Sequence, residues 1–186
     1  MSGKEIVERV TENAGFVHWH LVALERRQNG VYKKVRDMLP GILHLDVGCG
    51  EGFLLEELDY AVGVDLLDKY IRNAKNASKP IVKADALRLP FRDGVFDSLS
   101  YLFVLYNLYD EFVDGLDVKS KKVEALKEGY RTMKGNGTLL ALIDIDDMLP
   151  YGEYLKEVGF EVEKTGVIRK NILFGYHNFI RALKRA

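Results

Sequence analysis

The sequence predicts an α/β protein built on a doubly wound, mostly parallel β-sheet. Short apolar runs of roughly four to eight residues alternate with amphipathic segments over residues 40–150, which is typical of strands joined by crossover helices. The first of these runs ends in an aspartate and a glycine-rich loop, and two later runs also end in aspartates. After Pro150 two alternating segments follow each other closely, which indicates a hairpin-like pair with one antiparallel strand.

The predicted elements follow the chain in a simple order. Residues 4–27 repeat apolar side chains at helical spacing, with Gly15 as a break, and residues 31–39 form a further helical stretch. The predicted strands are Ile42–Val47, Ala61–Val64, Ile81–Ala84, Phe96–Phe103 and Thr138–Ile145. The predicted helices between them are Gly52–Leu58, Lys69–Asn76 and Glu111–Met133, with a short turn or helix near Leu87. A helix over 150–158 and alternating segments over 160–170 and 174–184 complete the chain.

Length and composition favour one globular domain. With 186 residues, 47% hydrophobic and 30% charged, the chain has room for a single full core. We expect a single domain over 1–186, divided into a helical N-terminal cap (1–39), a ligand-binding core (40–150) and a C-terminal strand pair (151–186). No Pro- or Ser-rich linker or internal repeat interrupts it.

Charge and targeting signals exclude several classes of protein. The net charge of −1 gives no overall attraction to nucleic acid or to acidic membranes. Cys49 is the only cysteine, so an internal disulfide cannot form. The charged N-terminal stretch does not resemble a signal peptide, and no apolar run approaches the ~20 residues of a membrane span. We therefore expect a cytoplasmic enzyme or binding protein.

The loop "DVGCGEG", residues 46–52, is the first candidate binding element. It follows the first strand at the carboxyl end of the sheet, where open α/β folds bind ligands. A dinucleotide fingerprint needs G-x-G-x-x-G, whereas Gly52 here comes one residue early. A carboxylate at Asp46 would repel a pyrophosphate and attract an ammonium group. A ligand with an amine, a carboxylate and adenosine fits better, with its carboxylate near the helix expected after the loop.

Two further aspartates end the next strands. Asp65 follows Gly48 at nearly the spacing expected for a carboxylate that binds ribose hydroxyls. Asp85 ends the third strand, where its carboxylate could accept an adenine amino proton while the Ala86 N–H donates to the ring. Each signal alone is weak, because an aspartate at a strand end is often a helix cap. Their occurrence together and in order favours a nucleoside site.

At these residues the sequence resembles the class I S-adenosylmethionine-dependent methyltransferases over residues 40–150, and we expect the resemblance to extend to the end. "LDVGCGEG" looks like the first motif of that family, "VGVDL" like its acidic loop, and "ADALRLPF" like its adenine loop. The resemblance implies a Rossmann-like, seven-stranded sheet with an antiparallel last strand. It implies S-adenosyl-L-methionine as the cofactor. We expect no metal, because His18 and His20 lack the i, i+4 spacing of helical zinc ligands. The cofactor-binding residues it implies are Asp46, Gly48, Cys49, Gly50, Gly52, Asp65, Leu66, Asp85 and Ala86.

The acceptor side is less specific. The motifs are especially like the small-molecule and tRNA-uridine branches, which often place histidine after the fourth strand, where this chain has Tyr106-Asn107. We expect acceptor contacts from Tyr106, Asn107 and Tyr109. Further candidates lie in two other segments, Asp144, Asp146 and Asp147 after the fifth strand and His18, Trp19 and His20 in the cap. The amino-methylating signature [DNS]-P-P-[YFW] is absent at 101–104, which lowers the odds of DNA-base methylation.

We therefore predict a methyltransferase acting on a small molecule, with neither DNA nor a membrane as partner. The alternative is an RNA methyltransferase that uses the basic C-terminal stretch, whose cationic residues are Arg169, Lys170, Arg181, Lys184 and Arg185. The simpler explanation of these charges is an edge strand protected against aggregation. A third hypothesis is a non-catalytic subunit that binds cofactor or a partner, and a nicotinamide oxidoreductase ranks last because of the glycine spacing.

Overall fold

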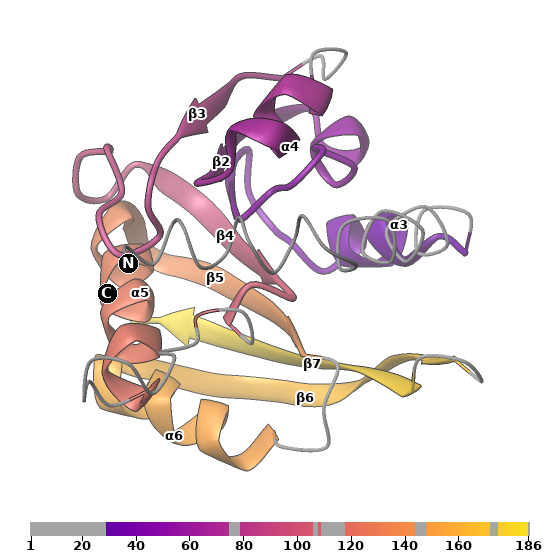
Figure 1. The fold of residues 1–186 in the computed structure, drawn as a ribbon. Coiled ribbons are helices and arrows are strands. Elements are labelled where there is room, and N and C mark those ends of the chain that lie inside the picture. The colour runs from indigo at the N-terminus through magenta and orange to yellow at the C-terminus, as the bar shows by residue number, and fades with distance from the viewer. Residues whose placement is uncertain are drawn as a thin grey trace.

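The computed structural model describes residues 29–74, 79–105, 108, 118–143, 148–171 and 175–185. Seven strands form one sheet in the order β3-β2-β1-β4-β5-β7-β6 (Figure 1). The strands are β1 (Leu43–Val47), β2 (Tyr60–Asp65), β3 (Ile81–Lys83), β4 (Phe96–Leu102), β5 (Met133–Ile143), β6 (Phe160–Asn171) and β7 (Gly175–Lys184). The helices are α3 (Val31–Asp37), α4 (Asp68–Asn73), α5 (Val118–Thr132), α6 (Met148–Val158) and the 3₁₀ helix η2 (Leu55–Glu57).

The sheet is parallel except at its C-terminal strand. β1 pairs in parallel with β2 and β4, and β3 and β5 extend the parallel part on either side. β7 runs antiparallel between β5 and β6. The predicted doubly wound, seven-stranded sheet with an antiparallel last strand is confirmed.

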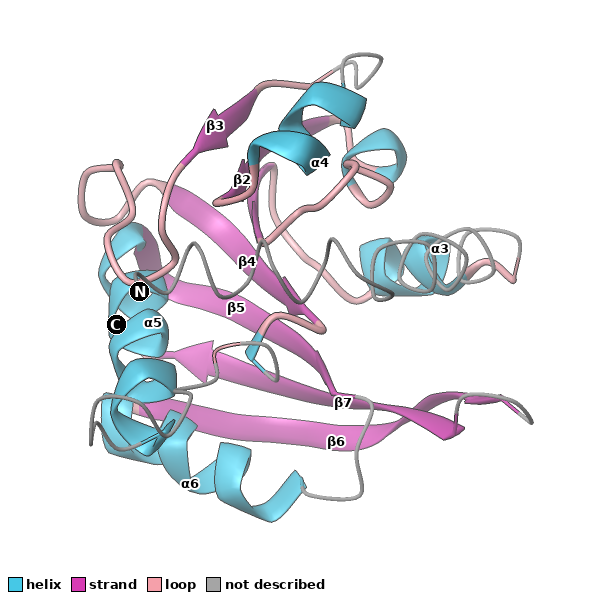
Figure 2. Ribbon diagram, in the orientation of Figure 1, coloured by secondary structure: helices cyan, strands magenta, loops and turns pink. Residues whose placement is uncertain are grey.

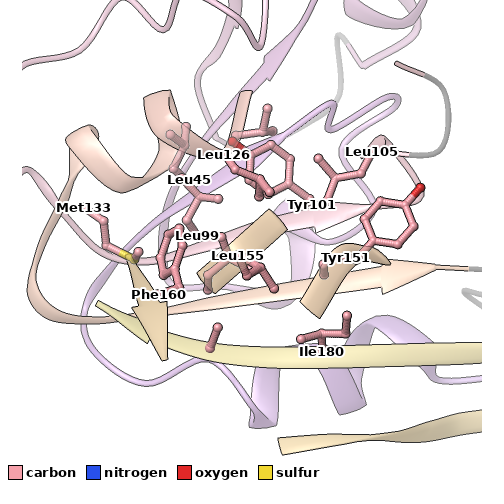
Figure 3. Close-up of a cluster of buried hydrophobic side chains, with 14 of the residues drawn as sticks. Leu45, Leu99, Tyr101, Leu105, Leu126, Met133, Tyr151, Leu155, Phe160 and Ile180 are labelled. Atoms are coloured by element: carbon pink, nitrogen blue, oxygen red, sulfur yellow. The ribbon is translucent and has the colours of Figure 1, made fainter. Parts of the chain in front are cut away.

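One face of the sheet carries the larger hydrophobic core. Alternate residues of the strands point to this face, for example Leu45 of β1, Leu99 of β4 and Leu139 of β5. Helices α5 and α6 cover it, and their Leu126 and Leu155 are fully buried there (Figures 2 and 3). Burial of these alternating apolar side chains explains why the strands form at these positions.

The opposite face is covered by α3 and by the segment around η2. Leu140 and Leu142, which alternate with the residues of the first face along β5, belong to this second core. Val31 and Val35 of α3 pack there and are 0% exposed. The chain is therefore layered as helix, sheet and helix, which buries the parallel strands on both sides. The predicted helical stretch over residues 4–27 lies outside the described residues.

The predicted helix over Gly52–Leu58 is wrong. This segment forms only the three-residue η2, with Leu54, Leu55 and Leu58 buried. Gly52 has φ +81, outside the helical region, so a helix cannot begin at this residue. The apolar residues that suggested a helix instead pack against α3 in the second core.

The fifth strand begins earlier than predicted. It starts at Met133 instead of Thr138, because the Gly135-Asn136-Gly137 segment lies within the strand as an irregularity. The register against β4 shifts there, with Phe96 opposite Met133 and Ser98 opposite Thr138. Asn136 takes φ +62, a conformation that asparagine tolerates better than most residues. The segment therefore forms a β-bulge within the strand, and β5 begins before it, at Met133.

Candidate functional site

The glycine loop folds back onto the end of β2. The backbone N–H groups of Gly48 and Cys49 both donate to the Val64 carbonyl, at 2.7 and 2.9 Å. The N–H of Gly50 donates to Oδ2 of Asp65 at 2.9 Å. The loop after β1 and the aspartate at the end of β2, which are 15 residues apart in the sequence at Gly50 and Asp65, are therefore joined directly.

Two of the glycines are required for different reasons. Gly48 has φ +70, and a Cβ there would lie 2.1 Å from Cγ2 of Val104, so the loop presses against the chain leaving β4. Gly50 has φ +54, and a Cβ there would meet nothing within 4 Å. The backbone at Gly48 is thus packed, whereas the space above Gly50 is open and can admit a ligand.

Asp65 is buried at the end of β2, with 8% of its surface exposed. Its Oδ2 accepts the Gly50 N–H, and its Oδ1 accepts the Leu67 N–H at 2.9 Å. Burial raises the pKa of the Asp65 carboxyl, and the hydrogen bonds from Leu67 and Gly50 oppose that rise. Each oxygen still has a lone pair for a further donor. The following residue, Leu66, is half-buried.

Asp46 lies one residue before the end of β1 and is 2% exposed. The Ser100 hydroxyl donates to its Oδ1 at 2.6 Å. Burial raises the pKa of Asp46 to about 7; the Ser100 hydrogen bond opposes this and the charge of Asp65 adds to it. A cation beside this carboxylate would offset the free-energy cost of burying its negative charge. The carboxyl ends of β1 and β2 therefore favour a cationic ligand group.

Cys49 points away from the open side of the loop. Its Sγ packs against Gly63 of β2, where a Cβ would come within 2.6 Å of it. Burial raises the pKa of the Cys49 thiol, so this thiol stays protonated and is a poor nucleophile. Its backbone, rather than its side chain, is what the loop offers to a ligand.

The end of β3 adjoins the same site. The Ala84 N–H donates to the Asp65 carbonyl at 3.0 Å, so the next residue, Asp85, follows closely on Asp65 in space. The exposed Asp85 accepts the Leu87 N–H on Oδ1 at 2.9 Å, and the segment near Leu87 is a turn rather than a helix. Ala86 is half-buried in this turn.

The segment after Asp85 is held by α5. Arg131 donates to the carbonyls of Leu89 at 3.0 Å and Phe91 at 2.8 Å. Glu128 accepts the Leu89 N–H at 2.8 Å and pairs with the Arg131 guanidinium. Three predicted binding elements, the glycine loop and the ends of β2 and β3, thus lie together at the carboxyl ends of the parallel strands.

Two residues beside these elements were not predicted. Ser100 holds Asp46, and a hydroxyl within the apolar run of β4 was the signal that could have revealed it. Tyr70 on α4 is half-buried, and burial together with the charges of Asp65 and Glu51 raises the pKa of its hydroxyl to about 12. Tyr70 therefore remains neutral next to the acidic residues.

The predicted acceptor-side residues lie outside the described residues. They are Tyr106, Asn107 and Tyr109 after β4, Asp144, Asp146 and Asp147 after β5, and His18, Trp19 and His20 in the N-terminal segment. The chain leaving β4 is described as far as Leu105. There Phe103 takes φ +63 although it is not glycine, and its N–H donates to the Leu142 carbonyl at 3.0 Å. This fixes the backbone at the point where the chain leaves β4.

Three cations of the basic C-terminal stretch are engaged within the fold. Arg181 pairs with Glu163 at 3.2 Å, and Arg185 pairs with Glu161. The Lys184 ammonium donates to the Tyr130 and Met133 carbonyls at 2.8 and 2.7 Å. β7 lies between β5 and β6 and β6 is at the edge, so the expectation that the whole stretch protects an edge strand is wrong for β7.

Other candidate features lie elsewhere or are absent from the described residues. A pocket of about 260 Å³ lies at the amino ends of β1 and β2, away from the glycine loop, with His44, Ile42 and Tyr60 among its lining residues. Within the described ranges, no group of three or more His, Cys, Asp or Glu could hold a metal ion. No helix of that same part of the chain is long and apolar enough to cross a membrane.

Comparison with known proteins adds to this geometry. Residues 45–141 match the model of a family described as "Methyltransferase domain". The chain is 30% identical to a demethylmenaquinone methyltransferase of Staphylococcus aureus, over 84% of this chain and 70% of that protein. It is 28% identical to a probable tRNA methyltransferase 9B of Mus musculus over 59% of this chain, and this match spans only 23% of that protein.

A solved structure with the same fold covers almost the whole chain. It is the magnesium protoporphyrin IX methyltransferase of Synechocystis PCC 6803, which was crystallised with bound SAM. It superposes with a TM-score of 0.75 over 99% of this chain and 98% of that one, at 17% sequence identity. At that identity the likeness concerns the fold.

Proposed function

This chain belongs to the Methyltransferase domain family, and on that premise we propose that it transfers a methyl group from S-adenosyl-L-methionine to a small-molecule acceptor. The observation that carries the proposal is the junction of Gly50 and Asp65, which joins the glycine loop to the acidic end of β2. In the sequence these two elements resemble the cofactor motifs of such methyltransferases. Their direct contact in the fold supports one binding site.

The described residues fit this cofactor. The open space above Gly50 can admit its central part, since nothing lies within 4 Å of a Cβ there. Asp46 offers a carboxylate to its ammonium group, and Asp65 retains lone pairs for the ribose hydroxyls. Asp85 and Ala86 adjoin Asp65 and suit the adenine. We propose that Gly48, Cys49, Gly50 and Gly52 contribute through their backbone, and that Leu66 packs beside the nucleoside.

Methyl transfer depends more on the alignment of the two reactants than on proton transfer. When bound, the cofactor supplies an electrophilic methyl group. Well-oriented reactants reach effective molarities of about 10⁵–10⁸ M, so residues that hold and orient the two reactants supply much of the rate enhancement. A general base is needed only where the acceptor must lose a proton. We propose that the chain beyond β4, with Tyr106, Asn107 and Tyr109, contacts the acceptor.

The fold favours a small-molecule acceptor over RNA. Arg181 and Arg185 pair with glutamates, and Lys184 is bound to two carbonyls, which reduces the positive charge available for a phosphate backbone. The relative named as a demethylmenaquinone methyltransferase matches along most of both chains, whereas the tRNA relative matches over 23% of its length. Both names supply acceptors for a first assay.

The test is a calorimetric titration with S-adenosyl-L-methionine, S-adenosylhomocysteine and NAD in parallel. We expect the first two to bind and NAD not to. Asp65→Ala should weaken cofactor binding by about 1–3 kcal/mol through loss of a charged acceptor. The matched control is Asp59→Ala, which replaces an exposed aspartate just before β2 and should bind as the wild type does.

Binding of NAD alone, or of none of the three ligands, would contradict the proposed function. If the cofactor binds, transfer of its labelled methyl group should be assayed to demethylmenaquinone and to tRNA. Transfer to tRNA that falls steeply with salt, and that is lost on charge reversal of Arg181 and Arg185, would favour RNA instead.

A further inference from the structure

Two hydroxyls of β4 face two polar side chains of β1. In the parallel pairing, His44 is opposite Ser98 and Asp46 is opposite Ser100. Each pair makes a side-chain hydrogen bond, between His44 Nδ1 and Ser98 Oγ and from Ser100 Oγ to Asp46 Oδ1. All four side chains are buried, and Ser100 is 1% exposed. The second pair lies at the ligand end of the sheet.

The carboxylate of Asp46 is held from one side only. Ser100 donates to Oδ1 at 2.6 Å, whereas Oδ2 accepts no hydrogen bond from the described residues. The neighbouring groups do not neutralise it: Asp65 of β2 adds negative charge, and Cys49 of the loop is a buried thiol. A buried carboxylate with one free oxygen needs a cationic or donor partner.

We propose that Ser100 is a positioning residue, which orients the Asp46 carboxylate so that its free oxygen receives the ammonium group of the cofactor. This inference rests on the proposed function. Ser100 itself touches no ligand; it acts by fixing the Asp46 side chain and by stabilising its ionised form through a hydrogen bond to the charged oxygen.

Proton coupling makes the role of Ser100 measurable. Asp46 has a pKa of about 7 without a ligand, and an ammonium group beside it would lower that pKa. Binding should therefore release a proton, and affinity should rise as the pH increases to about 7. Affinity should fall again above about pH 8, because a free α-amino group has a pKa of roughly 7.7–8.0.

The experiment compares Ser100→Ala with the wild type in calorimetric titrations from pH 6 to pH 8.5. Loss of the hydroxyl should move the rise in affinity upward by about one pH unit, which leaves about a tenth of Asp46 ionised at pH 7 instead of half. We expect binding of S-adenosyl-L-methionine to weaken about fivefold at pH 7. Binding of 5′-methylthioadenosine, which has no amino acid group, should be unchanged.

Two further variants separate positioning from packing. Ser100→Thr keeps the hydroxyl and should restore the pH profile. Ser98→Ala removes the equivalent hydroxyl two residues earlier on the same strand and should leave the profile as in the wild type. A pH profile for Ser100→Ala identical to that of the wild type, or an equal shift in Ser98→Ala, would overturn the inference.

The wild type alone supplies a second measurement that needs no variant. Titration at pH 6.5 in two buffers of different ionisation enthalpy should give a net release of roughly half a proton or more with S-adenosyl-L-methionine and none with 5′-methylthioadenosine. Release of no proton would overturn the inference while leaving the proposed function standing. If the wild type binds neither S-adenosyl-L-methionine nor S-adenosylhomocysteine, the proposed function itself fails, and this inference with it.

Discussion

Asp46 and Asp97 lie at opposite ends of the paired strands β1 and β4, and their surroundings shift their pKa values in opposite directions. Asp97, near the start of β4, accepts the N–H groups of Ile42 and Leu43 on Oδ2 and the Lys134 ammonium on Oδ1. These donors lower its pKa to about 2. Asp46, near the end of β1, has one hydroxyl donor, and burial raises its pKa to about 7.

The difference separates a structural carboxylate from a binding one. Asp97 has as many donors as its charge needs, so it stabilises the fold and has little left to offer a ligand. Asp46 is buried with its charge largely uncompensated, which costs stability in the absence of a ligand. Asp46, at the carboxyl end of the sheet, thus keeps an oxygen with no hydrogen-bond donor among the described residues, whereas both oxygens of Asp97 have donors, as expected if Asp46 belongs to a functional site.

The largest expected effect comes from removing the charge of Asp46. The folded pKa of Asp46 lies above the unfolded value of ~3.9, so the wild type should lose stability as the pH rises from about 4 to about 7. Asp46→Asn keeps the shape and the Ser100 hydrogen bond, and should raise the free energy of unfolding at pH 8 by on the order of 3 kcal/mol. Urea unfolding at pH 4 and pH 8 measures it.

The same variant should bind S-adenosyl-L-methionine at least tenfold more weakly, as expected when a charged partner is lost. A less stable Asp46→Asn at pH 8 would show that the Asp46 charge is compensated in the folded protein, which would remove the contrast between the two aspartates.

The next effect has the opposite sign. Asp97→Ala should lower the free energy of unfolding by about 2 kcal/mol at pH 7, because Leu43 and Lys134 lose their acceptor. Since the folded pKa of Asp97 lies below the unfolded value, its contribution is complete above about pH 4 and is lost as the pH falls toward 2. Cofactor binding should not change. A stability difference from wild type that persists at pH 2 would contradict this origin.

The smallest effect on stability concerns two glycines, one at each end of the sheet. Gly50 and Gly94 have φ +54 and +65, and neither has an atom within 4 Å of a built Cβ. Alanine at either position should cost about 1 kcal/mol through backbone strain alone. Only Gly50→Ala should also weaken cofactor binding, by tenfold or more, because its methyl group enters the ligand space. Equal cofactor binding by the two variants would show that the ligand does not lie against Gly50.

The sheet was predictable because burial on both faces leaves a strong local pattern. The strand from Phe96 was predicted to end at Phe103 and ends at Leu102, and the second predicted strand is longer by one residue at each end. Each is an apolar run bounded by turn residues. The predicted glycine loop and the aspartates Asp46, Asp65 and Asp85 also lie at or next to the carboxyl ends of β1, β2 and β3, as predicted.

Local pattern failed where tertiary contacts replaced it. The leucines of Gly52–Leu58 suggest a helix, but Gly52 has a left-handed backbone and the segment forms only one 3₁₀ turn, whose leucines pack in the core shared with α3. The basic residues near the C-terminus suggest a protected edge strand, but β7 is an interior strand, and Arg181 and Arg185 pair with glutamates of β6. Neither partner is near in sequence, so neither contact leaves a local signal.

The sequence by itself determined the α/β architecture, the order of the binding elements and the residue types that a nucleoside with an amine requires, because these depend on periodicity and on strand-end spacing. Only the tertiary structure decided which groups meet. It set the register that places Ser100 opposite Asp46, and it brought Gly50 to Asp65. Burial there makes one carboxylate of the site weakly acidic, and burial is a property of the packed sheet.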